Sequence, residues 1–390
     1  MTVLEAVVKQ TGIYAASRKG RLSVFWGDQV FLPSAAFQYK PTHHIDIMCT
    51  LLGDTAPTAA EWSEQGLDKY GVIACIEAAD GRLDAAQVEK VSHETAVGML
   101  AKLGKIRQVG PSLGSFSVSA AMLAALCDEF DAELKAKTAK LDTDPHFWMP
   151  LTLSVDDYVS LMKQKGTDEA EAKAHHARMA VMKAAFEMGD LGLFGAVDVG
   201  KDACWWDYGQ LKLYSKCCLL LLEKDGNADL LRQFLGVASH QIDSTLDGVT
   251  VDEDSYLFAT KAKSGSIQNS ILSSVQATEI NADGAIIVNC VANKITAGKG
   301  AILYNLIDDS PEGIVAEAGQ VIVAVTVEDG ASTMLKSRMD IDGGTAWKIK
   351  LDENPLSFED VHKKNKDANI REIQKKRQEN FTKMAASLGF

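Results

Sequence analysis

The stretch EINADGAIIVNCV, residues 279–291, and the stretch KITAGKGAILYNLI, residues 294–307, align as two copies of one pattern. The alignment matches Ile280 with Ile295, Ala282 with Ala297, Gly284-Ala285-Ile286 with Gly300-Ala301-Ile302, and Asn289 with Asn305. A looser third copy, IVAEAGQVIVAV, follows at residues 314–325. Aliphatic and small residues recur about every six positions, which is typical of a hexapeptide β-helix. A β-sandwich remains the alternative.

The chain before these repeats has a different pattern, in which predicted strands alternate with predicted helices. Apolar stretches at 22–26, 44–49, 70–78 and 112–119 indicate strands, and the spacing of apolar residues predicts a helix over 120–140. Strands that alternate with helices favour an α/β sheet. A polar helical region follows at 155–189, and a helix at 211–223 is apolar almost all round, so we expect it to be buried.

We therefore expect an α/β domain over 1–241, a β-helix over 242–350 and a charged helical tail over 351–390. Ile370, Ile373 and Phe381 are the few apolar points of the tail, which predicts a solvated cap or an interface helix. A basic helix lying on a membrane surface is the alternative, although its apolar face is thin. Because coils of a β-helix cannot cover their own ends, stacking or oligomerisation is also expected.

Composition excludes several classes of function. The net charge of −13 over 390 residues disfavours binding to a nucleic-acid backbone. No apolar run approaches the ~20 residues of a membrane span, and the N-terminal residues do not form a secretory signal. The seven cysteines are scattered without a CxxC pair, which favours a reducing, cytoplasmic location. An acidic site can still hold phosphorylated substrates through a divalent cation.

Two segments offer carboxylates for such a cation. In RLSVFWGDQVFLPS, residues 21–34, an apolar strand leads into Gly27-Asp28, and ligands gather at the carboxyl ends of strands in open α/β sheets. Asp28 is thus a candidate ligand for a hard cation, with a plain turn as the alternative. In ACWWDYGQ, residues 203–210, Asp207 follows Trp205 and Trp206. The alternative there is a pair of core tryptophans and an aspartate that caps a helix near Gln210.

Between these segments lie YGV (residues 70–72), the pair Glu89-Lys90, and the glycine-containing strand at 112–119. Adjacent residues of a strand point to opposite faces, so Glu89 and Lys90 can share one site only if the chain bends there. A surface pair is the alternative.

The order of these elements resembles the sugar-1-phosphate nucleotidyltransferases, also called nucleotide-sugar pyrophosphorylases. The resemblance implies a Rossmann-like nucleotidyltransferase domain followed by a left-handed parallel β-helix. It implies that Asp28 and Asp207 bind the catalytic Mg²⁺, and that Lys90 meets the sugar phosphate as the catalytic residue. The sugar-phosphate site that it implies consists of Gly71, Glu89, Lys90, Gly114 and Trp205. The sequence departs from the family in Val91, where a proline usually follows the Glu-Lys pair. His146, Phe147 and Trp148, after Asp144, are expected to shape the choice of sugar.

The glycine-rich loop with which this family binds the nucleoside triphosphate has no counterpart before Asp28. The nearest segment, Arg18-Lys19-Gly20-Arg21, has a single glycine, and residues 17–21 are interpreted as a turn into the strand. Three explanations stay open. The sequence is a truncated gene product, another chain supplies the missing part, or the protein is a remodelled non-enzyme.

The leading hypothesis is nucleotidyl transfer from a nucleoside triphosphate to a sugar 1-phosphate, by a homo-oligomer or with a partner chain that completes the first domain. The alternative is a catalytically inactive assembly or scaffold protein that oligomerises through the β-helix and the tail. Neither membrane nor nucleic acid is expected as a partner. An acyltransferase is a third hypothesis, but the β-helix segment has no histidine between His240 and His362. The adjacent pairs His43-His44 and His175-His176 lack the i, i+4 spacing of metal ligands on a helix and are interpreted as structural or surface residues.

Overall fold

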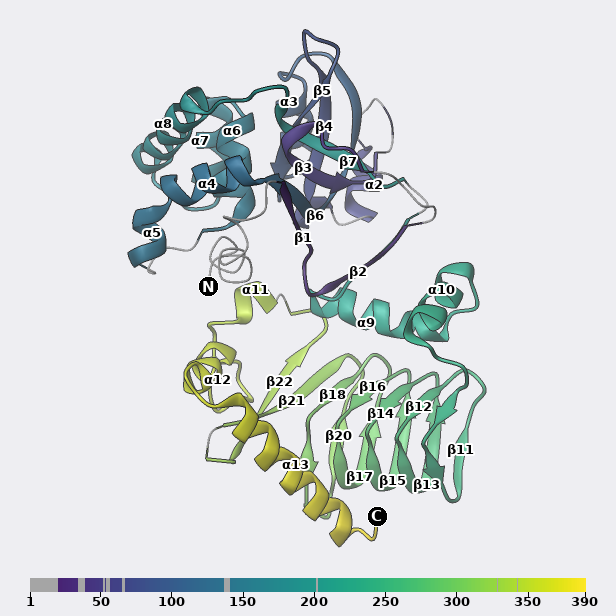
Figure 1. Ribbon diagram of the computed structural model, residues 1–390. Helices are drawn as coiled ribbons and strands as arrows, with labels where there is room; N and C mark the ends of the chain where they lie inside the picture. Colours follow the sequence, from purple (N-terminus) through teal and green to yellow (C-terminus); the bar gives the residue numbers. More distant parts are fainter. Residues whose placement is uncertain are drawn as a thin grey trace. The chain divides into compact units, whose positions relative to one another are not determined.

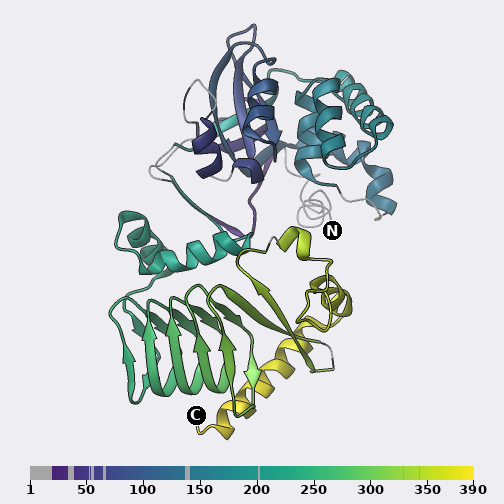
Figure 2. The same cartoon turned by 180° about the vertical axis from the view of Figure 1, so that it is seen from behind.

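The computed structural model describes residues 20–33, 39–51, 53, 57–64, 67–136, 141–200, 203–327, 329–341 and 343–390. The chain divides into two compact units, Met1–Trp205 and Trp206–Phe390 (Figures 1 and 2). Residues 17–19 of the expected N-terminal turn and residues 137–140 of the expected helix lie outside the described residues.

The first unit is built on a mixed sheet in the order β5-β4-β6-β3-β7, with β1 paired to β6. Its strands are β1 (Arg21–Val24), β2 (Gln29–Leu32), β3 (His43–Cys49), β4 (Gly71–Glu77), β5 (Leu83–Glu89), β6 (Ile106–Ser119) and β7 (Gly192–Asp198). β3 and β7 run parallel, whereas β3, β4 and β1 are antiparallel to β6. A two-stranded pairing joins β2 to β8 (Cys204–Asp207), the strand in which the first unit ends.

Helices α4 to α8 form a cluster to one side of this sheet, and α2 and α3 lie outside the cluster (Figures 1 and 2). The helices of the unit are α2 (Ala59–Glu64), the 3₁₀ turn η1 (Leu67–Lys69), α3 (His93–Leu100), α4 (Ala120–Glu129), α5 (Asp131–Ala136), the π-helix η2 (Asp144–Trp148), α6 (Met149–Thr152), α7 (Val155–Gln164) and α8 (Glu169–Ala185). Side chains cap several of them, among them Ser92 for α3, Ser119 for α4, Ser154 for α7 and Asp168 for α8. The predicted helix over 120–140 is broken at Phe130, which ends α4.

The core of the first unit explains why these strands form. Ile45, Ile47 and Cys49 of β3 are fully buried and pack with Met122 and Phe130, near the start and at the end of α4. Removing such side chains from water stabilises the fold by about 1.5–3 kcal/mol each. The predicted strand at 22–26 is shorter in the structure, because β1 stops at Val24 and Gly27-Asp28 form a turn to β2.

The second unit is a parallel β-helix (Figure 1). Its strands are β9 (Gln241–Ile242), β10 (Thr245–Leu246), β11 (Val249–Val251), β12 (Tyr256–Phe258), β13 (Lys261–Gln268), β14 (Ile271–Ser273), β15 (Gln276–Asp283), β16 (Ile286–Val288), β17 (Val291–Ala297), β18 (Ile302–Tyr304), β19 (Ile307–Asp308), β20 (Ile314–Ala316), β21 (Gln320–Thr326) and β22 (Ser332–Arg338). One ladder runs β9-β12-β14-β16-β18-β21, and β22 closes it by antiparallel pairing with β21.

The register of these strands reproduces the sequence repeat. Ile280 pairs with Ile295 and Ala282 with Ala297, and the third copy continues the stack, because Ile295 pairs with Ile314. An inner column of aliphatic residues, each at most 3% exposed, runs through successive coils: Leu257, Leu272, Ile287, Leu303 and Ile322. The parallel ladders confirm the β-helix and exclude the β-sandwich. An α/β unit, a parallel β-helix and a C-terminal helix together confirm the predicted fold class.

Corners of the β-helix require left-handed backbone. Asn289 and Asn305, matched in the sequence repeat, have φ values of 55° and 62°, and the Asn289 side chain donates to Asn305 Oδ1 at 3.3 Å. Asparagine is one of the few non-glycine residues that tolerate this conformation. Ala259 and Ser274 occupy the corresponding corners of earlier coils, with φ values of 48° and 55°.

The remaining helices of this unit are α9 (Leu211–Leu219), the 3₁₀ turn η3 (Leu220–Leu222), α10 (Gly226–Leu235), α11 (Gly343–Ala346), α12 (Phe358–Asn365) and α13 (Ile370–Ser387). The prediction that the helix over 211–223 is buried all round was wrong, because only Ser215 and Cys217 are buried within α9. Its apolar residues Leu211, Tyr214 and Cys218 instead pack along one side of the β-helix. The apolar residues therefore form a docking face.

The charged tail also packs on the β-helix. Ile373 and Phe381 of α13 are buried, and Phe381 contacts Val291 of β17, whereas Ile370 is 53% exposed. Arg377 donates to the backbone oxygen of Asn289 at 2.7 Å. Within the described residues, no helix is both long and apolar enough to cross a membrane.

Candidate functional site

The open end of the β4–β5 hairpin brings three of the expected site residues together. Gly71 and Glu89 are direct cross-strand partners, and Lys90 follows where β5 ends. Lys90 has a left-handed φ of 54°, and its N–H donates to the Tyr70 carbonyl at 3.0 Å. This is the bend that Glu89 and Lys90 needed to share one site.

The bend places the two charges in contact. Lys90 Nζ lies 2.6 Å from Glu89 Oε1, and the Glu89 side chain is buried. A second lysine, Lys165, follows α7 and approaches the other carboxylate oxygen of Glu89 at 3.9 Å. Burial by itself lowers the pKa of Lys90, but the charge and hydrogen bond of Glu89, with help from Asp144 and Asp142, raise it above its ordinary value. Lys90 is therefore a cation at neutral pH.

A second acid, Asp144, and a buried amide, Gln87, complete this cluster. Gln87 lies two residues before Glu89, so its side chain points to the same face of β5. Its amide nitrogen donates to Oδ1 of Asp144, the first residue of η2. Burial, together with the nearby Glu89 charge, raises the pKa of Asp144 to about 7, while Lys90 and Lys165 oppose the shift. Asp144 thus titrates near neutral pH.

Two of the expected site residues are glycines that other side chains approach closely. A Cβ atom on Gly71 would lie 2.6 Å from Gln87 Nε2 and 3.2 Å from the Ser112 side chain. Gly114 has a φ of 76°, and a Cβ there would lie 2.8 Å from Trp26 Nε1. Both positions therefore require glycine, Gly71 for close approach and Gly114 also for its backbone conformation.

Trp205 lines a small cavity of about 140 Å³ with Trp26, Phe31 and Ser115 among its neighbours. Its ring lies edge-on to Tyr70 at 5.2 Å between centroids, and Tyr70 in turn precedes Gly71. The indole nitrogen of Trp205 is buried and has no hydrogen-bond partner among the described residues. Trp205 thus packs near the hairpin end through Tyr70, and Gly114 packs against Trp26, which lines the same cavity as Trp205.

The two expected metal ligands lie in different units. Asp28 is exposed in the turn between β1 and β2. Asp207 ends β8 and is 9% exposed, and its Oδ1 accepts a hydrogen bond from the Gly209 N–H at 2.7 Å. Asp207 does not cap α9, because the N-cap residue of that helix is Gln210. Their pairing at one Mg²⁺ ion remains a prediction.

The donor chemistry of these aspartates fits a hard cation, since carboxylate oxygens are what Mg²⁺ prefers. The Gly209 amide fixes the Asp207 carboxylate, and the Asp28 carboxylate is accessible. Among the residues that the structure describes, no group of three or more His, Cys, Asp or Glu could hold a metal ion.

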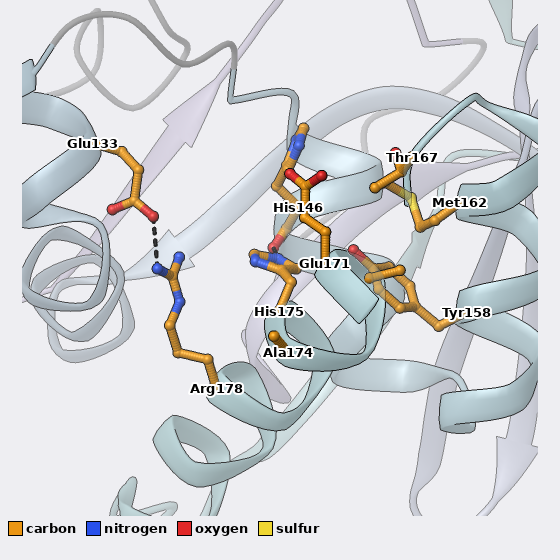
Figure 3. A pocket seen from close by; sticks show the side chains of 10 residues that line it. Glu133, His146, Tyr158, Met162, Thr167, Glu171, Ala174, His175 and Arg178 are labelled. Atoms are coloured by element: carbon orange, nitrogen blue, oxygen red, sulfur yellow. Dashed lines mark hydrogen bonds and ion pairs between the residues drawn. The ribbon is translucent and has the colours of Figure 1, made fainter. Parts of the chain in front are cut away.

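The residues that follow Asp144 do not line the cluster around Glu89. Phe147 and Trp148 are each 2% exposed and belong to the hydrophobic core, so the expectation that they select the sugar was wrong. His146 points instead into a second cavity of about 320 Å³, which Figure 3 shows beside His175, Tyr158 and Arg178. Only Asp144 from this segment contacts the cluster around Glu89.

Arg178, which lines the second cavity, is paired with two acids. Arg178 bonds Glu133 at 2.6 Å (Figure 3) and Glu129 at 2.8 Å. The His175 ring contacts the His146 carbonyl at 3.0 Å, and burial lowers the pKa of His175. These contacts tie α8 to α4, α5 and η2, so this part of the wall has a structural role. The histidine pair His43-His44 is buried as well and is structural.

Sequence reasoning missed Gln87 and Lys165, and it assigned no role to Asp144 itself. Gln87 had one available signal, because it shares a strand face with Glu89. Nothing in the sequence indicated Lys165, which lies 76 positions from Glu89 and reaches it only through the packing of α7.

No protein-family model matches this chain, and no curated protein matches its sequence. Among solved structures, the chain is similar to one described as mannose-1-phosphate geranyltransferase from Thermus thermophilus. The TM-score is 0.29 and the identity 13%, over 87% of this chain and 71% of that chain. A similarity of this size does not assign a function, which therefore has to come from the residues of the site.

Proposed function

We propose that the chain transfers a nucleotidyl group from a nucleoside triphosphate to a sugar 1-phosphate, releasing pyrophosphate and a nucleotide sugar. The observation that supports the proposal most strongly is the meeting of Gly71, Glu89 and Lys90 at one hairpin end. The glycine, the buried carboxylate of Glu89 and the charged ammonium of Lys90 lie together there. A sugar phosphate offers hydroxyl groups to the carboxylate and a dianion to the ammonium.

In the proposed step, an oxygen of the sugar phosphate bonds to the α-phosphorus of the triphosphate. The bond from that phosphorus to the bridging oxygen breaks, and the electron pair leaves with pyrophosphate. Lys90, assisted by Lys165, orients the sugar phosphate and balances its charge. Glu89 holds the sugar through its hydroxyl groups. The protein's contribution is position and electrostatics, as in other phosphoryl-type transfers.

Asp28 and Asp207 would hold the Mg²⁺ ion. The bound ion would neutralise negative charge on the phosphate oxygens. We further propose that the protein acts as a homo-oligomer or with a partner chain that contributes contacts to the triphosphate.

The test is pyrophosphate release with Mg²⁺, measured over a panel of nucleoside triphosphates and hexose 1-phosphates. We expect release with at least one combination and a loss of tenfold or more in Lys90→Gly, which suits the left-handed backbone while removing the ammonium. Lys102→Gly is a close control, since Lys102 also contacts a carboxylate at 2.6 Å and is similarly exposed, 63% against 57% for Lys90. Asp28→Asn should abolish the Mg²⁺ dependence, with Asp80→Asn in another exposed turn as its control.

An assembly or scaffold protein is the competing function. It predicts no pyrophosphate release with any combination and no binding of hexose 1-phosphates in calorimetry. That result, obtained with folded wild-type protein, would overturn the enzymatic proposal.

A further inference from the structure

Gln87 carries a buried hydrogen-bond acceptor for which the described residues supply no donor. The residue is 1% exposed, and its amide nitrogen is bound to Asp144. The amide oxygen is buried and has no hydrogen-bond partner among the described residues. An orphaned buried acceptor destabilises a fold by about 1–3 kcal/mol, so its retention points to a use in binding.

The position of Gln87 places this amide next to Glu89 and Gly71, two residues of the proposed sugar site. Gln87 and Glu89 project from the same face of β5, and Gly71 faces Glu89 across the hairpin. Because a Cβ on Gly71 would lie 2.6 Å from Gln87 Nε2, the amide packs directly against Gly71, at the hairpin end where Glu89 and Lys90 meet.

We infer that the Gln87 amide oxygen accepts a hydrogen bond from one hydroxyl group of the bound sugar, with Asp144 anchoring the amide so that this oxygen faces the substrate. The inference deepens the proposed function and rests on it. It makes Gln87 a specificity-determining contact and Asp144 a positioning residue. The ligand class is a sugar phosphate with a free ring or exocyclic hydroxyl next to the Glu89 carboxylate.

Asp144 suits the anchoring role because its carboxyl accepts from the amide and thereby selects its orientation. An amide whose nitrogen is bound to a carboxylate cannot turn over without losing that bond and placing its oxygen against the acid. A sugar that lacks the matching hydroxyl would leave the amide oxygen unpaired, which is how buried polar groups discriminate between substrates.

The experiment measures binding of hexose 1-phosphates by calorimetry to the full chain. The probes are the tightest binder among α-D-glucose, α-D-galactose and α-D-mannose 1-phosphates, its monodeoxy analogues, and inorganic phosphate. We expect one monodeoxy analogue to bind wild-type protein about tenfold more weakly than its parent. Gln87→Met, a variant of similar length without polar atoms, should weaken parent binding about tenfold and remove this discrimination, while binding of inorganic phosphate stays unchanged.

Gln276→Met is the matched control, because Gln276 in the β-helix also has a buried amide oxygen without a partner among the described residues. It should leave every affinity unchanged. If Gln87→Met does not fold, Gln87→Asn withdraws the amide oxygen by one methylene and should lose discrimination in the same way. A purely structural role for Gln87 predicts a lower melting temperature with unchanged discrimination.

The outcomes separate the inference from the proposed function. Parent binding that depends on Lys90 but is the same in wild type and Gln87→Met overturns the inference alone. Discrimination that survives in Gln87→Met has the same consequence. If neither inorganic phosphate nor any hexose 1-phosphate binds wild-type protein, the proposed function fails and the inference fails with it.

Discussion

Gly71 and Glu89 face each other across the last pair of the β4–β5 hairpin, so the buried Glu89 residue has no side chain opposite it on β4, and the Gln87 amide packs against Gly71. On most antiparallel pairs a second side chain would cover this carboxylate. The Gly71–Glu89 pair thus leaves a buried carboxylate without a cross-strand side-chain neighbour.

Gly71→Ala should damage binding more than it damages the fold. The added methyl group would meet Gln87 Nε2 at 2.6 Å and force that amide away from Asp144. We expect a loss of about 1–3 kcal/mol in unfolding free energy, the usual cost of overpacking, and at least tenfold weaker binding of hexose 1-phosphate. Gly98→Ala in α3, where nothing lies within 4 Å, should instead stabilise the protein slightly. Unchanged sugar-phosphate affinity in Gly71→Ala would contradict the assignment of this face.

Asp144→Asn should alter the pH dependence of stability. The pKa of Asp144 is raised to about 7 in the folded protein, against about 3.9 for an unfolded aspartate. The folded carboxyl keeps its proton where the unfolded one has lost it, so its stabilising contribution is full below about pH 4 and is lost as the pH rises through about 7. Asparagine stays neutral, so the variant should match wild type near pH 4 and exceed its stability at pH 8 by about 1 kcal/mol.

Urea unfolding followed by tryptophan fluorescence at several pH values measures this difference. Asp157→Asn provides a comparison of opposite sign. Burial raises the pKa of Asp157, but hydrogen bonds from Lys102 and Ser154 outweigh it and hold the pKa below its ordinary value. That variant should lose most stability relative to wild type at neutral pH and least in acid. Parallel pH profiles for wild type and Asp144→Asn would show that Asp144 does not titrate as described.

Ala259→Gly should stabilise the β-helix. Ala259 holds a φ of 48° at a corner where later coils have asparagine, and a left-handed alanine is strained by roughly 1 kcal/mol. Relief of that strain should raise the unfolding free energy by about 0.5–1 kcal/mol in calorimetry. Ala285→Gly, at a fully buried position without positive φ, should lower it. If both glycines destabilise equally, strain at the corner is not the cause.

His175 should make the first unit sensitive to acid. Burial, with the charges of Arg178 and His146 adding to it, outweighs the hydrogen bond with the His146 carbonyl and lowers the pKa of His175 below its ordinary value. The folded ring stays neutral below pH 6.5, where an unfolded histidine takes up a proton, so its stabilising contribution is present above about pH 6.5 and is lost as the pH falls. Wild type should therefore lose more stability between pH 7 and pH 5 than His175→Gln. Equal losses in the two proteins would contradict this account.

Much of the fold was predictable because it depends on local spacing. The match of Ile280 with Ile295 in the sequence is the same match that β15 and β17 make in the ladder. The strand over 44–49 was also found, since a run of apolar residues buried on both faces is a local property. The helix over 211–223 was placed correctly but its burial was not, because burial depends on which neighbour covers each face.

The candidate site was predictable from the sequence only where the residues that form it are adjacent in the chain. Glu89 and Lys90 form such a pair, and the resemblance to a family named their partner Gly71. The bend at Lys90 was required by the hypothesis, and the backbone supplies it with a left-handed φ. Asp144 and Lys165 come from segments 55 and 76 positions beyond Glu89 and meet it through the packing of η2 and α7.

The sequence by itself determined the parallel coils, the strands of the sheet and the residue types available for binding a sugar phosphate. These follow from periodic burial and from side-chain chemistry, which are readable along the chain. The tertiary structure alone decided which acids and lysines surround Glu89, and that the Gln87 oxygen is left without a partner among the described residues. Such relationships depend on how distant elements pack, where a shift of an ångström makes or removes a hydrogen bond.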